Sequence, residues 1–170
     1  MCTISPEVAG SLNVCAFLDV IAHSELGDTL LAASDDGYNV IVGSTPANPI
    51  LFSSYADHPH RLIGPPILPQ GLESTAAGRY QLLARYYDVY KAQLGLPDFG
   101  KLSQDTIAIQ QIRERYVLDS LIAGDLKTTI SKCCNIWASL PGSPYGQHTN
   151  NYDDLRAQYL LCGGTLLPGQ

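Results

Sequence analysis

The chain has few charged residues, and they do not gather into runs. Asp, Glu, Lys and Arg make up 15% of its 170 residues, and the formal net charge is -6. An average soluble domain carries about 25% charged residues, and disordered chains combine low hydrophobicity with high charge. The composition therefore favours a single globular domain over residues 1–170. Because no cluster of Lys or Arg is present, nucleic acid and anionic membrane surfaces are poor candidate partners.

Long apolar runs are missing as well. No segment approaches the roughly 18 apolar residues that a membrane-spanning helix needs. Residues 1–6 lack the basic stretch of a signal peptide, and the helix expected after them carries Asp19, His23 and Glu25. We therefore expect no stable membrane association and a protein that at first stays in the cytosol.

The five cysteines follow no disulfide or zinc-binding pattern. Their number is odd, Cys133 and Cys134 are adjacent, and no CxxC or Cys/His spacing occurs. We interpret them as reduced thiols, most of them buried. Asp57, His58 and His60 could suggest a metal site, but a solvated loop is the favoured interpretation. No metal and no cofactor are expected.

An acidic residue stands on the apolar side of the first expected helix. Apolar residues from Val14 onward follow the spacing i, i+3, i+4, i+7, which predicts a helix packed by one side on a core, and Glu25 continues that row. Gly27 could end the helix in a left-handed conformation. Because burial disfavours an ionised carboxyl group, Glu25 could keep its proton and act as a general acid. The alternative is a surface glutamate just past the last core turn.

The rest of the chain predicts a small β region followed by helices. Residues 38–43 and 50–52 are expected to pair as short strands, and residues 56–73, with four prolines, to form a stiff irregular loop. Helices are expected over residues 74–94, 103–116, 117–123, 126–136 and 151–161. One helix, a small sheet and then several helices make an α+β fold.

Several motifs stand in a fixed order along the chain. They are GYNVIVG at 37–43, YADHP at 55–59, STAAGRYQLL at 74–83, LGLPDF at 94–99, SQD at 103–105, NIWASLPG at 135–142, YGQ at 145–147 and GGT at 163–165. Together they resemble the phage lambda endolysin family of lytic transglycosylases, whose members carry an STxAGRYQLL segment. The resemblance runs in register from about Ala16 to Thr165, nearly the whole chain, which makes it specific.

The resemblance implies a lysozyme-like α+β fold, with the active-site cleft between a small β-containing lobe and a mainly helical lobe. The family's catalytic acid is the glutamate of a Ser-Glu-Gly segment that ends the first helix. Ser24 and Glu25 match that segment, with Leu26 placed before Gly27. The family match and the apolar row therefore select the same residue, Glu25.

The resemblance also implies residues that bind the substrate. Tyr80 and Gln81 are expected at the start of a helix lining the cleft, where they could bind sugar acetamide groups, although Tyr80 also fits the apolar row of that helix. Tyr145 and Gln147 are expected on a loop that forms the opposite lip. Asn39 stands where the family has an aspartate facing the substrate, and the loop from 43 to 74 is longer and richer in proline than in the family.

The implied reaction is cleavage of the MurNAc–GlcNAc β-1,4 bond of peptidoglycan with formation of 1,6-anhydro-MurNAc ends. A hydrolase needs a second carboxylate beside the scissile bond, and Asn39 cannot supply one. The nearest carboxylates in the sequence are Asp28, Asp35 and Asp36, which are expected in a polar turn. A transglycosylase needs only Glu25, because the muramyl C6 hydroxyl attacks its own C1. The alternatives are a hydrolytic muramidase on the same fold and a non-catalytic wall-binding protein.

The resemblance finally implies the partners and the place of action. We expect a monomer that binds peptidoglycan glycan strands. It would remain in the host cytoplasm until the membrane is permeabilised and then act on the cell wall from the periplasm.

Overall fold

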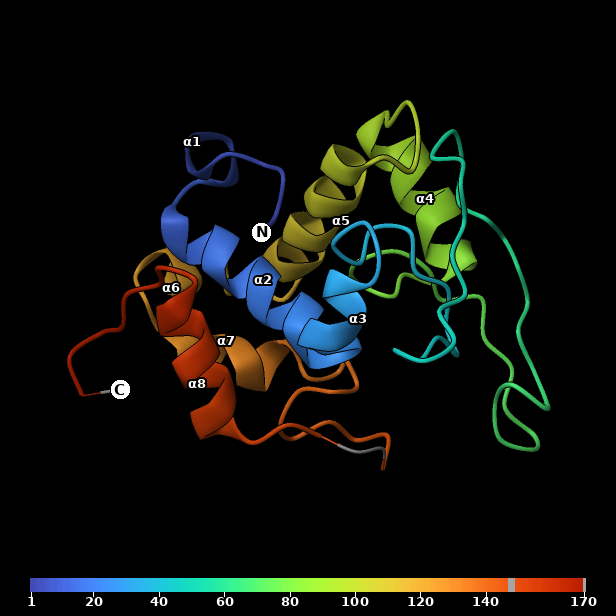
Figure 1. Cartoon of the computed structure of the whole chain (residues 1–170). Coiled ribbons are helices and arrows are strands. Elements are labelled where there is room, and N and C mark those ends of the chain that lie inside the picture. Colours follow the sequence, from blue (N-terminus) through green and yellow to red (C-terminus); the bar gives the residue numbers. More distant parts are fainter. Residues whose placement is uncertain (147–148, 170) are drawn as a thin grey trace. The chain divides into compact units, whose positions relative to one another are not determined.

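The computed structural model describes residues 1–146 and 149–169, and these are mainly helical (Figure 1). The helices are α1 (Pro6–Ala9), α2 (Leu12–Leu26), α3 (Asp28–Ala32), α4 (Ala84–Leu94), α5 (Lys101–Glu114), α6 (Leu118–Ile122), α7 (Leu126–Cys133) and α8 (Tyr152–Leu161). The chain divides into two units: unit 1 is Met1–Glu25 with Asp105–Gln170, and unit 2 is Leu26–Gln104. The predicted cleft between two lobes stays a prediction.

Helix α2 forms the centre of unit 1. The predicted apolar row has no exposed surface: Val14, Phe17, Leu18 and Ile21. The prediction of a helix packed by one side only is wrong, because every residue from 13 to 22 is buried. A helix with few polar residues over this stretch is enclosed on all sides. Its last turn, which carries Ser24 and Glu25, therefore rests on a firmly packed support.

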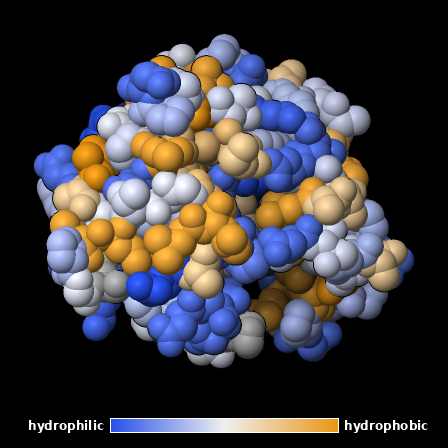
Figure 2. All heavy atoms as spheres, turned by 60° about the vertical axis from the view of Figure 1, so that its left-hand side comes forward, coloured by the Kyte–Doolittle hydropathy of each residue, from blue (hydrophilic) through white to orange (hydrophobic). Residues whose placement is uncertain are grey.

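Unit 1 also exposes apolar side chains at the other end of α2. Figure 2 brings the side of α1 and α8 forward and shows apolar side chains on that surface. Exposed members are Val8, Leu12, Ile122, Leu160 and Leu161. Leu12 and Glu25 lie at opposite ends of α2, roughly 20 Å apart at a rise of 1.5 Å per residue. This surface is therefore separate from the end of α2 that carries Glu25.

The predicted strand pairing in unit 2 occurs, but only as isolated contacts. Four antiparallel bridges are present: Val40–Leu51, Ile41–Ala77, Ile63–Ser74 and Ala77–Leu82. Within residues 1–146 and 149–169, no run forms a regular strand, so the sheet expected of the α+β fold is reduced to these bridges. Gly43 and Gly78 have positive φ angles, which break the extended backbone on either side. Residues 56–73 are irregular, as predicted.

The helix predicted to start at Ser74 or Thr75 begins later, at Ala84. The prediction fails because Gln81 has a φ of 48°, which no α-helix accommodates. Thr75 nevertheless caps the helix from a distance, since its hydroxyl accepts a hydrogen bond from the backbone N–H of Ala84 at 3.1 Å. The helix ends at Leu94, as predicted, and Gly95 follows in the left-handed conformation.

The later helices follow the sequence pattern closely. Helix α5 starts at Lys101, slightly before the predicted residue 103, and α6 and α7 are separated at Gly124 as predicted. Asn151 caps α8, since its side chain accepts a hydrogen bond from the backbone N–H of Asp154 at 2.9 Å. In the described part of the chain, none of the helices has the length and hydrophobicity needed to span a bilayer.

The cysteine prediction is only partly confirmed. None of the five cysteines forms a disulfide, but only Cys15 and Cys133 are buried. Cys2, Cys134 and Cys162 keep part of their surface exposed, because they lie near the chain start or at helix ends. The expectation that most of the thiols are buried is therefore wrong.

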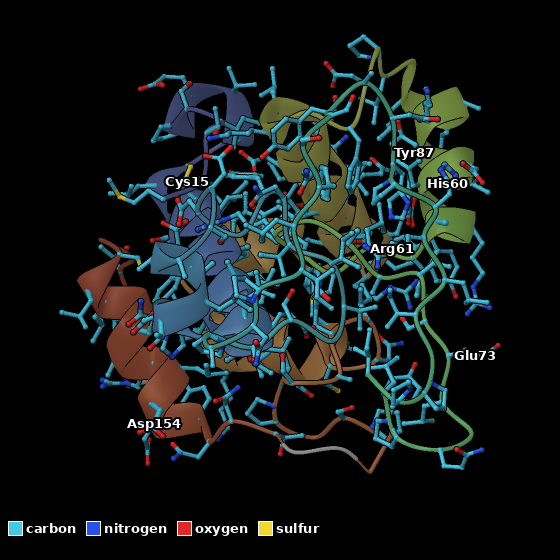
Figure 3. All side chains as sticks on the ribbon, turned by 45° about the vertical axis from the view of Figure 1, so that its right-hand side comes forward. Cys15, His60, Arg61, Glu73, Tyr87 and Asp154 are labelled. Carbon is cyan, nitrogen blue, oxygen red and sulfur yellow. The ribbon has the colours of Figure 1, made fainter. Side chains whose placement is uncertain are left out.

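His58 corrects the prediction of a solvated loop. Its side chain is 3% exposed, and its Nε2 lies 3.0 Å from the carbonyl oxygen of Leu82. The neighbouring His60 lies beside Tyr87, with ring centroids 6.1 Å apart (Figure 3), and pairs with Asp88 at 2.8 Å. Among the described residues, no group of three His, Cys, Asp or Glu side chains could hold a metal ion.

Gly78 offers a test of unit 2 packing. A Cβ atom at this position would meet the Gln104 amide, which accepts a hydrogen bond from the backbone of Arg79 and donates to the carbonyl of Tyr38, each at 2.9 Å. We expect Gly78→Ala to lower the free energy of unfolding by about 2–5 kcal/mol, from left-handed strain and overpacking together. Gly71→Ala, with a similar φ and open space, should cost only about 1–2 kcal/mol. Urea unfolding measures both free energies, and equal losses of unfolding free energy in Gly78→Ala and Gly71→Ala would contradict this packing.

Candidate active site

Glu25 occupies the last turn of α2, one residue before the helix ends at Leu26. The helix ends before Gly27, as predicted, but Gly27 has a φ of 72° and a ψ of 151°, so it does not adopt the predicted left-handed helical conformation. The Glu25 side chain is half-buried. Its Oε1 accepts a hydrogen bond from the Ser139 hydroxyl at 2.6 Å. Glu25 therefore lies past the buried stretch of α2, as the alternative interpretation has it, but its side chain is only partly exposed and is held by Ser139.

The environment of Glu25 shifts its protonation equilibrium. Burial raises its pKa, while hydrogen bonds from the hydroxyl and the backbone N–H of Ser139 lower it, and the net pKa lies above the ordinary value. Burial therefore outweighs the bonds, although a hydrogen bond to a charged group stabilises it by roughly 1.5–3 kcal/mol. A carboxyl group whose pKa is raised toward neutrality suits a general acid.

Two further polar side chains extend the contact between Glu25 and Ser139. The hydroxyl of Ser24 donates to the hydroxyl of Ser139 at 2.8 Å. The side-chain amide of Asn150 donates to the hydroxyl of Ser24 at 2.9 Å. The end of α2 and the loop between α7 and α8 are thus joined through these four residues, all within unit 1.

The loop that carries Ser139 is anchored on both sides. Trp137 is 2% exposed and Leu140 is fully buried. The backbone N–H of Asn150 donates to the carbonyl of Ser139 at 2.9 Å, which ties Ser139 to the end of the loop that precedes α8. Ser139 and Asn150 therefore approach Glu25 from a fixed backbone.

Asn39 lies in unit 2 and lines a cavity of about 580 Å³. The side chain is half-buried, and its Oδ1 accepts a hydrogen bond from the backbone N–H of Asp35 at 3.0 Å. Other lining residues include Leu51, Phe52, Ser53, Ser54 and Arg61, the last labelled in Figure 3. Small-molecule sites have volumes of roughly 300–1,000 Å³ and combine apolar walls with a few polar groups, as this cavity does.

The acidic residues next to Asn39 are held by basic partners. Asp35 pairs with Lys101 at 2.5 Å and accepts a hydrogen bond from the Tyr55 hydroxyl at 2.7 Å. These bonds, first the one from Lys101 and then the one from Tyr55, lower the pKa of Asp35. Asp36 pairs with the guanidinium of Arg79 at 2.8 Å. Carboxylates held in this way are weak bases, because their basic partners stabilise the ionised form.

Tyr80 and Gln81 do not stand at the start of a helix, which corrects the prediction. They lie in the turn before α4, where Gln81 donates its side-chain amide to the carbonyl of Gly78 at 2.9 Å. Tyr80 is buried and meets Tyr38 edge to face, with ring centroids 6.5 Å apart. The packing alternative for the Tyr80 ring is therefore confirmed. Gln81 is half-buried.

Tyr145 stands on the loop between α7 and α8, as predicted. Its side chain is 56% exposed, and its hydroxyl donates to the carbonyl of Asn135 at 2.8 Å. The hydrogen bond therefore restrains the Tyr145 ring, while much of the ring surface stays exposed to solvent. Gln147, the other residue predicted on this lip, lies outside the described residues.

Comparisons with known proteins identify the family. A family model described as Endolysin matches residues 15–166. The endolysin of Escherichia phage lambda is 47% identical over 152 residues, which cover 89% of this chain and 91% of that protein. The endolysin of Escherichia phage P2 is 43% identical over 161 residues, covering 94% of this chain and 98% of that protein. The chain belongs to the endolysin family.

Solved structures agree with the sequence comparison. Bacteriophage lambda lysozyme complexed with a chitohexasaccharide superposes with a TM-score of 0.84 at 43% identity, over 98% of this chain and 100% of that one. Lysozyme from bacteriophage lambda superposes with a TM-score of 0.80 at 43% identity, over the same shares. The endolysin described here thus has a lysozyme-like fold and is an enzyme of phage cell-wall degradation.

Sequence reasoning missed two members of the network around Glu25. Ser139 lies within the NIWASLPG motif, between two residues that turn out to be buried, and a polar residue in such a setting could have been singled out. Asn150 carried no comparable signal, because its contact with Ser24 spans 126 residues of sequence.

The raised pKa of Glu25 has a consequence for stability. The folded endolysin disfavours the ionised side chain, so wild-type stability falls as pH rises from the unfolded pKa toward the folded one. The Gln side chain in Glu25→Gln is neutral at every pH, so this variant does not lose stability in that pH range. We therefore expect its unfolding free energy, relative to wild type, to be higher at pH 7 than at pH 4.

Urea unfolding at both pH values measures this difference. Glu7→Gln is the control, because Glu7 is exposed and its pKa is lowered, first by a hydrogen bond with the Ser5 side chain. The unfolding free energy of Glu7→Gln, relative to wild type, should not be higher at pH 7 than at pH 4. A relative stability of Glu25→Gln that is equal at the two pH values, or higher at pH 4, would contradict the buried acid.

Proposed function

We propose that this endolysin is a lytic transglycosylase that cleaves the MurNAc–GlcNAc β-1,4 bond of peptidoglycan, with Glu25 as its catalytic carboxyl group. The observation that carries the proposal is the half-buried Glu25 carboxyl, whose pKa is raised by burial and which is held by Ser139 at 2.6 Å. A positioned acid that keeps its proton is what departure of a glycosidic oxygen requires.

The reaction needs no second carboxylate. Glu25 gives its proton to the glycosidic oxygen as the bond to C1 of the muramyl sugar breaks. The C6 hydroxyl of the same sugar attacks C1, and Glu25, now ionised, takes the proton of that hydroxyl. Glu25 therefore ends the cycle protonated, as it began. No water is consumed, and the product carries a 1,6-anhydro ring. Because the attacking hydroxyl belongs to the substrate, proximity can lower the barrier by roughly 7–11 kcal/mol.

The polar groups of unit 2 support this choice over hydrolysis. Asn39 cannot accept a proton as a general base. Asp35 is paired with Lys101 and its pKa is lowered, which makes it a weak base for activating water. Asp36 is likewise paired with Arg79. An inverting or retaining hydrolase would need one of these carboxylates free beside the scissile bond.

The glycan-bound relative supports a saccharide as the ligand. Lambda lysozyme has been solved with a chitohexasaccharide, and we propose that the cavity beside Asn39 contributes to binding of the glycan strand. Tyr145 offers an exposed aromatic ring of the kind on which sugars stack. We further propose that the two units work together as one catalytic domain over residues 1–170 and that the enzyme acts as a monomer. Action from the host cytoplasm after membrane permeabilisation stays a prediction.

Digestion of purified sacculi in ¹⁸O-labelled water tests the reaction type. Mass spectrometry of the released muropeptides should find anhydro ends that are lighter by one water and carry no label. Asn39→Asp should change the rate and the pH optimum while leaving the product unchanged, because the C6 hydroxyl remains in the same molecule as C1 and keeps its advantage of proximity over water. Label on a new reducing end made by the wild-type enzyme would overturn the proposal and leave a hydrolytic muramidase.

A further inference from the structure

The side chains of Asn150, Ser24 and Ser139 form a chain of hydrogen bonds that leads to the carboxyl group of Glu25. Ser139 gives its single hydroxyl proton to Oε1 of Glu25 at 2.6 Å, so its oxygen must accept the next bond. Ser24 therefore donates to Ser139 at 2.8 Å, and the amide of Asn150 donates to Ser24 at 2.9 Å. Each donor along this chain points toward the carboxyl group of Glu25.

We propose that Ser24, Ser139 and Asn150 are positioning residues that hold the Glu25 carboxyl group in one orientation and stabilise its ionised form. The inference rests on the proposed acid–base role of Glu25. Hydrogen bonds in a chain polarise and strengthen one another, and a bond to a charged acceptor is stronger than one to a neutral acceptor. The chain therefore contributes most when Glu25 has given its proton to the leaving oxygen.

The same bonds decide which carboxyl oxygen reacts. Oε1 of Glu25 accepts the Ser139 proton, so the transferable proton is expected on Oε2. During the first step that proton moves from Oε2 to the glycosidic oxygen. In the second step Oε2 takes the proton of the C6 hydroxyl. Ser139 keeps its own proton throughout and acts only through Glu25.

Asn150 connects the chain to the backbone. Its amide also lies 3.3 Å from the carbonyl oxygen of Ser24, and its backbone N–H donates to the carbonyl of Ser139 at 2.9 Å. Asn151, next in sequence, caps helix α8. The donors are thus fixed to α2 on one side and to the start of α8 on the other, so the chain is held in place without help from the substrate.

Other titratable groups do not account for the behaviour of Glu25. Those on the described parts of α2, of the loop from 134 to 151 and of α8 are Cys15, Asp19, His23, Cys134, Tyr145, Tyr152, Asp153, Asp154, Arg156 and Tyr159. The pKa of Glu25 is raised by burial and lowered by Ser139, and none of these groups is among its causes. A change in the pKa after substitution of Ser139 therefore reports on the hydrogen-bond chain.

Ser139→Ala should make Glu25 a weaker acid. Without the donor its pKa rises further, so the alkaline limb of the kcat/KM profile on peptidoglycan should move to higher pH. At low pH kcat should fall roughly 10- to 100-fold while KM changes little, because the carboxylate formed in the first step loses its donor. Ser139→Thr, which keeps a hydroxyl, should restore most of the activity.

Ser24→Ala should also move the alkaline limb of the kcat/KM profile to higher pH, but by less than Ser139→Ala does. In the double variant, Ser24→Ala should add little to the shift caused by Ser139→Ala. Ser143→Ala is the matched control, since Ser143 stands on the same loop and its hydroxyl accepts a long hydrogen bond from the backbone N–H of Tyr145 at 3.5 Å. Its profile should equal that of the wild type. Titration of the Glu25 carboxyl carbon by NMR gives the pKa without reference to activity.

An unchanged Glu25 pKa in Ser139→Ala and Ser24→Ala would overturn the proposed chain. A loss of activity in Ser139→Ala with no movement of the pH limb would do the same, since it indicates a structural role only. The proposed function fails separately, if the folded Glu25→Gln enzyme keeps ordinary activity. In that case the NMR titration still decides whether the chain stabilises the ionised carboxyl group.

Discussion

The hydrogen bond from Ser139 to Glu25 is the interaction on which the site depends. Burial alone would leave Glu25 as a carboxyl group that releases its proton with difficulty, because an ionised group that has lost its water costs several kcal/mol. The Ser139 hydroxyl offsets part of this cost and fixes the orientation of Oε1. An acid that alternately gives and takes a proton needs both effects, and one short contact supplies them.

The rest of unit 1 keeps that contact in place. Helix α2 is enclosed from residue 13 to residue 22, so its last turn has little freedom. Trp137 and Leu140 are buried on either side of Ser139 and anchor the opposing loop. Tight packing of this kind transmits small volume changes, so substitutions in this core should be felt at Glu25 even where they touch no polar group.

The sequence predicts the helices better than it predicts the turns and the polar contacts. Periodic apolar residues locate α2, α5 and α8 within a few positions, because helix packing imposes its spacing on the sequence. The turn before α4 was misassigned, since the apolar side chains around Tyr80 fit a helical row while Gln81 adopts a left-handed conformation. Asn150 could not be predicted at all, because it meets Ser24 only after the chain has folded.

Turnover of purified sacculi by the Glu25→Gln variant tests the central claim most directly. The substitution keeps the size of the side chain and removes the transferable proton, and general acid catalysis contributes roughly 10²–10⁴-fold. We expect a loss of kcat at or beyond that range in a folded enzyme that still binds glycan, while Glu7→Gln stays fully active. Ordinary turnover by folded Glu25→Gln would contradict the account.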